Sequence, residues 1–341
     1  MKRFNKNLVT MLLVILVAFG LVACGSKSDN NGGNTSVTPG QTGDNVNTEG
    51  NNTADEDATN DVVLPTTDRA GNTITIPNEV NKIISLAPSI TQVLFDLEVG
   101  DKLVAVDKQS PLYAEVPSDI PQFEMMAPDL EQIIAISPDV VFVSSMTNYN
   151  GEDILKAVRD AGISVLEIPT SNSIEDIKKD IRFIADAVGK SSEGNVLVSD
   201  METTINKVAE IGGTITDKKT VVFEIGAAPD IYSFGKNVFL NEMIEIIGAT
   251  NIFADQEGWI SVSAESIVSM NPDVILTSVN YIENPIDEIK GRDGFSEITA
   301  VKNDMVYYID NGSSSLPNHN ITKALIQMAK AIYPEQYADL K

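Results

Sequence analysis

The chain has 341 residues and a formal net charge of −25, with 24 Lys and Arg against 49 Asp and Glu. This length predicts about two domains of ordinary size, and an apolar content of 43% supplies a hydrophobic core. The negative charge argues against nucleic acid as a partner, because its phosphates would be repelled. Solubility outside the cell is the simplest interpretation of such acidity, and docking onto a basic partner is also compatible with it.

The N-terminus has the features of a secretory signal. Its first six residues include three cations, and the apolar run over residues 8–22 is short for a membrane span of about 20 residues. Ala23 and then Cys24, the only cysteine of the chain, follow this run. We therefore predict a signal peptide over residues 1–24. The folded part should contain neither a disulfide framework nor a thiolate metal site.

Residues 25–61 consist mostly of Asn, Gly, Thr, Ser and acidic residues. Such a segment cannot bury enough apolar surface to offset the entropy of ordering. We predict a tether with an r.m.s. span of about 30 to 35 Å. A tether of this length would let a body that is held at a membrane move above it.

Residues 62–170 predict an N-terminal α/β lobe, because strands and helices alternate along this segment. The alternation implies parallel strands with right-handed crossovers. Pro88 should open the first helix with Ser85 or Ser89 as its cap, and Gly100 should end it. The expected elements are half of a small hairpin at 73–77, strands at 82–87, 103–106, 140–144 and 164–168, and helices at 90–97, 130–136 and 152–161.

Residues 171–213 predict helices with little strand signal. Apolar residues recur every three and four positions from Ile174 to Val188, and a second helical stretch covers 196–211. We interpret this segment as a long helical spine that crosses from one lobe to another. A pair of crossover helices within one continuous sheet is the alternative.

Residues 214–341 predict a C-terminal α/β lobe. Residues 128–145 and 262–279 share one pattern, a short helix, a Pro-Asp break and a β-branched strand, 134 positions apart. A second correspondence, at 148 positions, matches 84–106 with 232–254. These repeats indicate two similar lobes. The expected elements of the C-terminal lobe are strands at 220–225, 230–234, 251–253, 274–276 and 305–309, and helices at 239–247 and 321–332.

Hydrolytic catalysis has little support in the sequence. His319 is the only histidine, and the chain has no G-x-S-x-G, Walker-type phosphate loop or H-E-x-x-H motif. The acidic clusters lack calcium-loop spacing, and a zinc site with several His or Cys ligands is excluded by composition. We therefore expect no enzyme activity, no cofactor and no metal site.

Candidate ligand contacts lie in loops that follow the strands, because α/β proteins bind ligands at the carboxyl ends of parallel strands. Trp259, the only tryptophan, would stack on a ligand or anchor its own loop. Met125 would contact a ligand or fill a gap. The candidate contacts are Pro88, Ser89, Tyr113, Phe123, Met125, Trp259, Tyr281 and Ser314.

Several motifs resemble the substrate-binding proteins of ABC importers for vitamin B12 and iron complexes. They are K-I-I-S-L-A-P-S-I-T from Lys82, P-D-L-E-Q-I from Pro128 and P-D-V-V from Pro138, and the resemblance covers residues 82–309. It implies two Rossmann-like lobes joined by one long helix, with a ligand cleft between them and little hinge motion. The L-V-A-C sequence at Cys24 resembles the lipobox of bacterial lipoproteins, which implies a lipid on that cysteine.

The resemblance also implies that one exposed glutamate on each lobe meets arginines of the permease. Glu131 and Glu265 occupy the matching positions of the two repeats, so they become the candidate docking residues. Charge-assisted pairs with arginine would favour register and specificity. A solvated helix residue in a repeat is the alternative interpretation of each.

The chain departs from the family pattern at residues 123–126. The segment before P-x-L-E usually contains a glycine, and here it reads Phe-Glu-Met-Met. The arginines, at positions 3, 69, 159, 182 and 292, form no cluster with Tyr and His that would grip bare iron or an anionic siderophore. Aromatic and apolar edges with small polar groups favour a large neutral ring system such as a corrinoid.

The resemblance implies an extracytoplasmic lipoprotein at the outer face of the cell membrane. It would act as a monomer and deliver a corrinoid or an iron complex, siderophore or haem, to an ABC permease. The alternative is a surface lipoprotein that uses the same fold for sensing or adhesion.

Overall fold

The computed structural model describes residues 64–147 and 153–340. The predicted signal peptide and tether, together with Cys24, lie outside the described residues. The chain divides into two compact units, residues 1–62 and residues 63–341, and the elements below all belong to the second.

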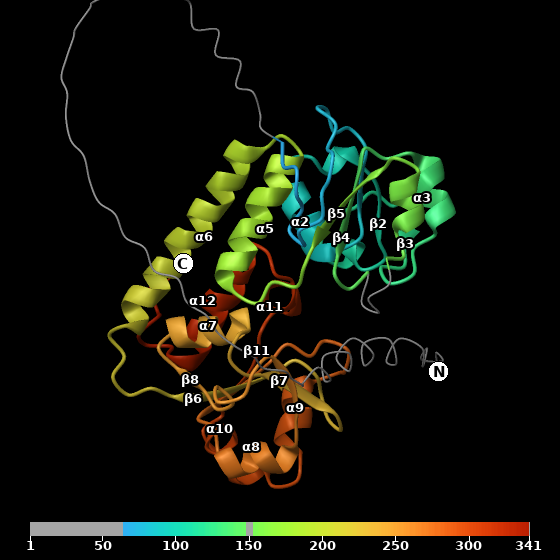
Figure 1. Cartoon of the computed structure of the whole chain (residues 1–341). Coiled ribbons are helices and arrows are strands. Elements are labelled where there is room, and N and C mark those ends of the chain that lie inside the picture. The colour runs from blue at the N-terminus through green and yellow to red at the C-terminus, as the bar shows by residue number, and fades with distance from the viewer. Residues whose placement is uncertain (1–63, 148–152, 341) are drawn as a thin grey trace, which may run out of the picture. The chain divides into compact units, whose positions relative to one another are not determined.

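Two parallel β-sheets form the framework of this unit (Figure 1). Their strand orders are β3-β2-β1-β4-β5 and β11-β10-β6-β8, and an antiparallel pair, β7-β9, forms a third sheet. The α/β prediction is confirmed. The strands are β1 Ile83–Ser85, β2 Leu103–Asp107, β3 Gln122–Phe123, β4 Val140–Ser144, β5 Ser164–Ile168, β6 Thr220–Glu224, β7 Ile231–Phe234, β8 Thr250–Asn251, β9 Trp259–Val262, β10 Val274–Thr277 and β11 Val306–Tyr308.

Helices cover both faces of the two parallel sheets, so the central strands are mostly apolar, and polar residues such as Asp107 and Glu224 lie at strand ends. The α-helices are α2 Pro88–Asp96, α3 Leu130–Ile136, α4 Lys156–Asp160, α5 Ile174–Ala187, α6 Ser191–Gly212, α7 Phe239–Ile246, α8 Ala264–Met270, α9 Pro285–Lys290, α10 Thr299–Lys302, α11 Asn311–Ser315 and α12 Ile321–Ile332. Short 3-10 turns are η1 Gly100–Lys102, η2 Ser110–Leu112 and η3 Phe295–Glu297.

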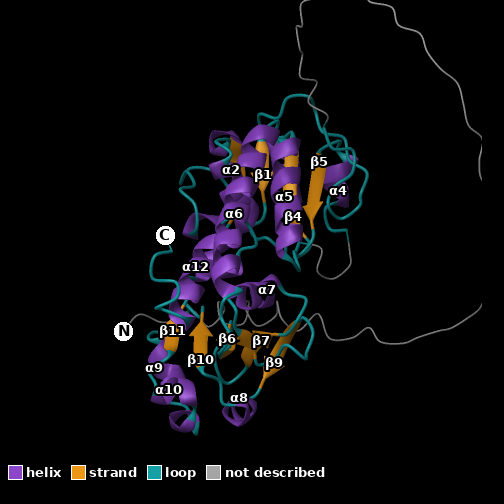
Figure 2. Ribbon diagram, turned by 90° about the vertical axis from the view of Figure 1, so that its left-hand side faces the viewer, coloured by secondary structure: helices purple, strands orange, loops and turns teal. Residues whose placement is uncertain are grey.

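Helices α5 and α6 form the predicted spine between the two lobes (Figure 2). Ser173 caps α5 by accepting a hydrogen bond from the backbone N of Asp176, and Gly189 takes φ +72° in the turn before α6. Helix α6 has 22 residues, which gives a length of about 33 Å. The two parallel sheets share no strand, so the alternative of a single continuous sheet is excluded.

The largest hydrophobic core is shared by the two lobes. It contains Ile83 and Phe142 of the first sheet, Phe223 and Leu276 of the second, and Met201 of α6. Two smaller clusters fill the opposite faces of the two sheets. A large displacement of one lobe against the other would expose apolar side chains of the shared core to water. The core therefore favours a fixed arrangement of the lobes.

The repeat at 134 positions is confirmed in its capping residues. Asp129 precedes α3 and accepts a hydrogen bond from the backbone N of Gln132. Ser263 precedes α8 and accepts one from the backbone N of Ser266. Both caps satisfy a backbone donor that the first helical turn leaves free, so the two repeats fold by the same local rule.

The matched aspartates of the Pro-Asp breaks join neighbouring strands. Asp139 Oδ2 accepts hydrogen bonds from the backbone N of Asn81 and of Lys82, at 2.7 and 2.8 Å. Asp273 Oδ2 accepts from the N and the Oγ1 of Thr220, both at 2.8 Å. Each aspartate thus fixes the start of one strand against the start of the next.

The strand predicted at residues 230–234 is confirmed as β7, but its match with the first strand of the N-terminal lobe is wrong. Strand β7 pairs antiparallel with β9 in register Phe234 to Trp259, outside the parallel sheet. The strand that corresponds to β1 is β6, because β6 lies between β8 and β10 as β1 lies between β2 and β4. The correspondence at 148 positions therefore holds only from α7 onward, after the additional strand β7.

The predicted ends of α2 are also corrected. Ala87 occupies the N-cap position and has no side-chain acceptor, while the Ser85 hydroxyl lies within the fold, 2.9 Å from Thr91 Oγ1. At the other end Glu98 takes the left-handed φ of +58°, in place of Gly100. Gly100 instead packs under the Phe95 ring, where an added Cβ would lie 2.7 Å from Cδ1.

Two other local predictions were too long. The segment 73–77 contributes a single antiparallel bridge, from Thr73 to Thr67, in place of a hairpin strand. Helix α4 begins at Lys156 and ends at Asp160, so it is shorter than the predicted 152–161. Gly162 follows it with φ +84°, as expected for a glycine at a helix C-terminus.

Substituting Gly212 by alanine should destabilise the protein strongly. Gly212 ends α6 against α7, and an added Cβ would lie 2.1 Å from the backbone O of Ile246. The clashing atom belongs to the backbone of α7, which cannot move aside as the end of a flexible side chain can. We therefore expect Gly212→Ala to lower the free energy of unfolding by about 3 kcal/mol. Denaturant unfolding measures this change.

Gly213 supplies the matched control. The nearest atom to an added Cβ there is Ala209 O at 3.4 Å, and the residue has a helical φ of −64°. Gly213→Ala should leave stability unchanged or raise it by up to about 1 kcal/mol. Equal losses in both variants would contradict the close approach of α6 to α7.

Candidate functional site

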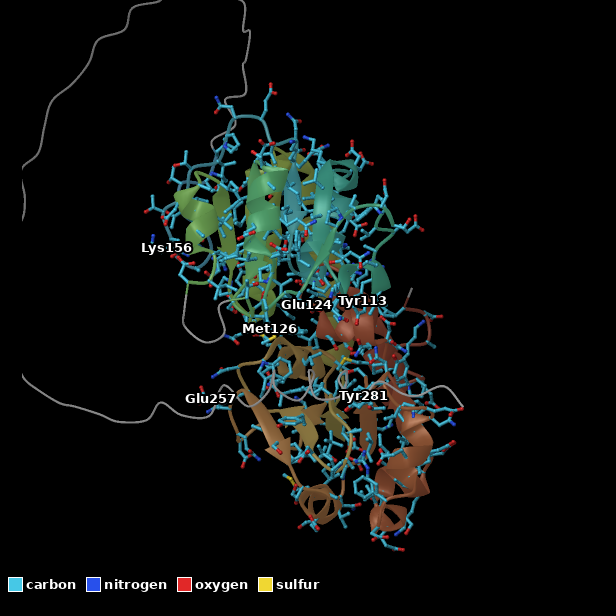
Figure 3. All side chains as sticks on the ribbon, turned by 90° about the vertical axis from the view of Figure 1, so that its right-hand side faces the viewer. Tyr113, Glu124, Met126, Lys156, Glu257 and Tyr281 are labelled. Atoms are coloured by element: carbon cyan, nitrogen blue, oxygen red, sulfur yellow. The ribbon has the colours of Figure 1, made fainter. Side chains whose placement is uncertain are left out.

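The carboxyl ends of the parallel strands of the two sheets face each other. In Figure 2 the arrowhead of β5 points down from the N-terminal lobe and that of β10 points up from the C-terminal lobe. Figure 3 places Tyr113 and Met126 at the lower edge of the N-terminal lobe, with Tyr281 and Glu257 on the lobe beneath. The loops from both lobes therefore meet where an α/β protein binds its ligand.

Tyr113 forms a direct contact between the lobes. Its Oη donates to Asn311 Oδ1 at 3.1 Å, and Asn311 Nδ2 donates to the backbone O of Ser278 at 2.8 Å. A Cβ added to Gly312 would lie 3.0 Å from the Tyr113 ring. Burial and, after it, the charge of Asp310 raise the pKa of Tyr113, so the phenol stays protonated and donates.

A buried polar network fixes the loop that carries Tyr113. Asp107, the last residue of β2, accepts hydrogen bonds from the backbone N of Gln109 and of Ser110 at 2.7 and 3.0 Å. The Ser110 hydroxyl donates to the Asp107 carboxylate and lies 2.8 Å from Thr91 Oγ1. Burial raises the pKa of Asp107, against the hydrogen bonds that it accepts. The network leaves this loop little freedom.

The surroundings of Ser89 are filled by the other lobe. Asn318, which is fully buried, donates from Nδ2 to the backbone O of Ser89 at 3.2 Å and to Gln92 Oε1 at 2.7 Å. Gln92 Nε2 in turn donates to the backbone O of Tyr113 at 3.0 Å. Pro88 is buried as the first residue of α2. Ser89 therefore lies in an interlobe seam, and Pro88 precedes it in the chain.

His319 belongs to the same seam. Its Nε2 lies 2.9 Å from Asp96 Oδ2 on α2, and its buried Nδ1 has no hydrogen-bond partner within the described part. A catalytic triad needs the second ring nitrogen to face a serine or its equivalent. His319 has no such partner in the described part of the chain, and its contact with Asp96 joins the two lobes.

The N-terminal lobe contributes Phe123 and Met125 with different exposure. Phe123 lies in β3 and is 3% exposed, within the smaller core of this lobe. Met125 is half-buried, and its Sδ accepts from Ser144 Oγ at 3.8 Å. Beside it, Glu124 Oε1 pairs with Lys108 Nζ at 2.5 Å. Met125 is therefore the one of the two that reaches the lobe surface.

The C-terminal lobe contributes Trp259, Tyr281 and Ser314. Trp259 is half-buried on β9 and meets the Phe234 ring edge to face, with centroids 6.0 Å apart. Tyr281 is 40% exposed, and its Oη accepts from the backbone N of Ala227 at 2.8 Å. Ser314 is 1% exposed and donates to the backbone O of Asp310, which is an internal role.

The two docking candidates lie at equivalent, exposed positions. Glu131 is the second residue of α3 and Glu265 the second residue of α8. Carboxylates are favoured at helix N-termini, where backbone donors point outward. Its own backbone N and the Ser263 hydroxyl lower the pKa of Glu265, so it is ionised at neutral pH.

Sequence reasoning missed the buried ion pair beneath the Tyr281 loop. Glu224, at the end of β6, accepts two hydrogen bonds from Arg292, at 2.7 and 2.9 Å, and Arg292 also pairs with Glu288 at 2.6 Å. The missed seam residues Gln92, Asn311 and Asn318 also pair over long sequence separations. No local motif marks such partners.

Neither a group of metal-ligating side chains nor a membrane-spanning helix is found in the described part of the chain. No group of three or more His, Cys, Asp or Glu side chains in residues 64–147 and 153–340 is placed to hold a metal ion. Nor does any helix within these ranges combine the length and the apolar character that a membrane crossing requires.

Comparison with known proteins gives one consistent family. Residues 83–312 match the model of a family described as periplasmic binding protein. The chain is 33% identical over 281 residues to an uncharacterized ABC transporter substrate-binding lipoprotein, YvrC, of Bacillus subtilis, covering 81% of this chain and 88% of that protein. A vitamin B12-binding protein of Vibrio parahaemolyticus is 26% identical over 263 residues, covering 75% and 91%.

Solved structures agree with these relatives. A possible iron-binding (periplasmic solute-binding) protein of Staphylococcus epidermidis is 31% identical and superposes with a TM-score of 0.66. The match covers 75% of this chain and all of that one. Both the sequence and the fold are thus similar to proteins that bind solutes.

Proposed function

The chain belongs to the family of periplasmic binding proteins, and on that premise we propose that it binds one solute between its lobes and delivers it to an ABC permease. The observation that carries the proposal is the meeting of loops from both lobes around Tyr113, with Tyr281 on the opposite lobe (Figure 3). Trp259 lies on β9 of that same lobe. The shared core supports a preformed site, which loses little entropy on binding.

The solute class that fits best is a corrinoid or an iron complex. Aromatic faces such as Tyr281 and Trp259 suit a large ring system. Lys108, which follows β2 in the N-terminal lobe, is already paired with Glu124 at 2.5 Å. A strongly anionic siderophore would have few partners there, and this favours a neutral ring. The named B12 relative agrees with this choice.

Of the predicted contacts, we carry forward those whose side chains reach the interlobe surface. They are Tyr113, Met125, Trp259 and Tyr281, which are half-buried or exposed. Pro88 and Ser89 would shape the seam through their backbone. Phe123 and Ser314 would act from the interior, as supports.

We assign permease docking to Glu131 and Glu265 and membrane attachment to a lipid on Cys24. One exposed carboxylate per lobe, at repeated helix N-termini, would fix the orientation of the receptor on a basic partner. Cys24 and residues 25–61 lie outside the described residues, so the anchor and tether rest on sequence. The receptor would act as a monomer at the outer face of the membrane.

A fluorescence titration tests solute binding. We expect the chain from residue 24, with Cys24→Ser so that it carries no lipid, to bind one corrinoid or haem per chain and to quench Trp259. Tyr281→Ala should weaken binding by about tenfold, since one aromatic contact is lost. Cobalamin, cobinamide, haem and ferric siderophores form the panel.

Trp259→Phe is the control for the signal. It should lose the fluorescence change and keep most of the affinity when binding is followed by calorimetry. A folded protein that binds no member of the panel would refute the ligand class. Binding that Tyr281→Ala leaves unchanged would refute the placement of the site.

A further inference from the structure

A second concave site lies on the N-terminal lobe, away from the interlobe loops. It is a pocket of about 530 Å³ between helix α5 and the segment that opens the described chain, Leu64 to Arg69. It is open to solvent, so it is a surface hollow and not an enclosed cavity. Helix α5 covers the sheet face opposite to α3, because its Ile181 packs with Ile83 while Ile133 of α3 packs with Ile84.

The lining of this pocket combines an apolar floor with a cationic rim. Leu64, Pro65 and Phe183 supply the apolar surface. The remaining lining residues include the cations Arg69, Lys179 and Arg182 against one acid, Asp186. In a chain of net charge −25, this excess of positive charge is local and opposite to the whole. Such a site favours an amphipathic anion.

Arg69 is held in place from behind. Its Nε donates to Asp180 Oδ1 at 2.6 Å, and Asp180 is itself buried and accepts from Ser171 Oγ at 2.7 Å. Among the described residues no hydrogen bond is recorded for its two terminal nitrogens. A guanidinium fixed through Nε presents these nitrogens as a fork, the geometry that suits a phosphate.

The loop that carries Arg69 is also fixed. Asp68 is buried, and its Oδ1 accepts from the backbone N of Ala70 and of Asn72, at 3.0 and 2.8 Å. Its Oδ2 accepts from the backbone N of Glu167 on β5 at 3.0 Å. The rim cation therefore sits on a turn that is tied to the sheet, so little ordering is needed when an anion binds.

The other two cations remain available. Lys179 makes no ion pair within the described ranges, and Arg182 Nη2 is 4.0 Å from Glu202 Oε1, which is a loose contact. The neighbouring Lys178 differs, because it pairs with both Glu175 and Glu202, at 2.6 and 2.9 Å. Two helical cations thus face the pocket without a strong partner.

We propose that this pocket binds the phosphate of an anionic phospholipid headgroup at the membrane that the proposed lipid anchor attaches the chain to. Arg69, Lys179 and Arg182 hold the phosphate, and Leu64, Pro65 and Phe183 receive the glycerol and the first acyl carbons. The proposal rests on the anchored location in the proposed function and adds a lipid contact to it.

Two observations favour a lipid over a free anion. A soluble phosphate has no use for the apolar floor, whereas a headgroup carries apolar atoms next to its phosphate. The pocket also includes Leu64 and Pro65, which come shortly after the predicted tether of residues 25–61. The tether would keep this end of the body within about 30 to 35 Å of the membrane. Elsewhere the acidic surface is repelled by anionic lipid, so contact with the lipid stays confined to the pocket while the receptor is not docked on the permease.

Vesicle flotation tests the proposal, with the chain from residue 24 carrying Cys24→Ser. We expect binding to vesicles of phosphatidylglycerol and phosphatidylcholine, and none to phosphatidylcholine alone. Lys179→Gln with Arg182→Gln should lower the partition coefficient by about 25-fold, since each cation near an anionic surface contributes about fivefold. Both side chains are at the surface, so the double variant should keep its unfolding temperature.

The matched control removes two cations elsewhere. Lys207→Gln with Lys218→Gln makes the same change in net charge at exposed positions outside the pocket, and partition should change by less than about twofold. Equal losses in both double variants would overturn the proposal in favour of diffuse attraction. Inorganic phosphate that binds in calorimetry while vesicles do not would overturn the lipid as the source.

The solute titration separates this inference from the proposed function. The Lys179→Gln, Arg182→Gln variant should bind the solute as the parent does. If the parent protein binds the solute but does not bind vesicles, the lipid pocket alone is refuted. If the parent protein binds vesicles through the pocket but binds no solute, the proposed function alone is refuted.

Discussion

Reversal of the charge at both Glu131 and Glu265 should abolish solute uptake while leaving solute affinity unchanged. Each glutamate lies in the first turn of its helix, exposed and at the same place in its repeat. If each meets an arginine of the permease, lysine there replaces an attraction by a like-charge contact, which costs several kcal/mol at an interface. We expect the receptor–permease affinity of Glu131→Lys with Glu265→Lys to fall by at least about 100-fold.

The single variants should give intermediate losses, because each lobe keeps one correct contact. Uptake of labelled solute by cells that produce only the variant receptor measures the effect, and the Trp259 titration measures affinity. Lysine in a first helical turn also opposes the helix dipole, by about 0.3 to 1 kcal/mol per site. Thermal unfolding will show whether the loss of uptake has that trivial cause.

Glu210→Lys with Glu335→Lys is the matched control, since both glutamates are exposed and the change in net charge is the same. It should leave uptake near the parental level. If it reduces uptake equally, overall charge and not the two docking positions governs the encounter. If Glu131→Lys with Glu265→Lys loses solute affinity, the two residues serve the ligand site or the fold.

The elements that the sequence predicted best are those set by local rules. Helix α3 and strand β4 begin and end where the pattern placed them, because Asp129 caps the helix and Pro138 follows its end. The matched unit at α8 and β10 follows the same rules. Burial on both faces makes β4 and β10 mostly apolar, and their short length, β-branched residues and flanking Pro-Asp breaks together favour a strand over a buried helix.

The predictions that failed depended on partners far away in the sequence. The residues of β7 look like any apolar strand, and only their pairing with β9 puts them outside the parallel sheet. Gly100 was assigned to end a helix, whereas the space under Phe95 decides its identity. Neither the partner strand nor the ring position can be read from a local pattern.

The candidate site divides in the same way. Loop positions after strands placed Tyr113 and Tyr281 near the interlobe surface, because the topology fixes where strands end. The contacts between the lobes were not predictable, since Asn318 and Ser89 are 229 positions apart and Tyr113 and Asn311 are 198 apart. Amides in loops have no periodicity, so nothing in the sequence marks their partners.

Replacing Arg292 by methionine should lower the free energy of unfolding by about 3 to 5 kcal/mol. The Glu224 side chain is completely buried and Arg292 is 7% exposed, so the variant leaves a buried carboxylate without its counter-ion. Glu288 is 33% exposed and can return to water when Arg292 is lost. Denaturant unfolding measures the loss.

The double variant Arg292→Met with Glu224→Met should recover most of that stability. Two apolar side chains of similar length fill the same space with no charge to desolvate, and such replacements of a buried pair are often neutral. A double variant as unstable as the single one would mean that shape and not charge holds this part of the lobe together.

The pH dependence of the single variant gives the sharper test. Burial raises the pKa of Glu224, and hydrogen bonds from Arg292 oppose that rise. Without Arg292 the folded-state pKa lies further above the unfolded value of about 4.3. Stability from the protonated form is then fully present below the unfolded pKa and lost as pH rises through the folded one. The deficit of Arg292→Met should therefore be smaller near pH 4 than at pH 8, and the double variant should lack this dependence.

The ion pair also connects stability to binding. The backbone O of Glu224 accepts from the backbone N of Ser278 at 3.1 Å, and the loop that continues from Ser278 carries Tyr281. Arg292 follows α9, at the other end of that loop, so the pair closes the loop at its base. Arg292→Met should weaken solute binding even where the protein is folded, because Tyr281 is no longer held in position. Unchanged affinity in a folded variant would limit the pair to a structural role.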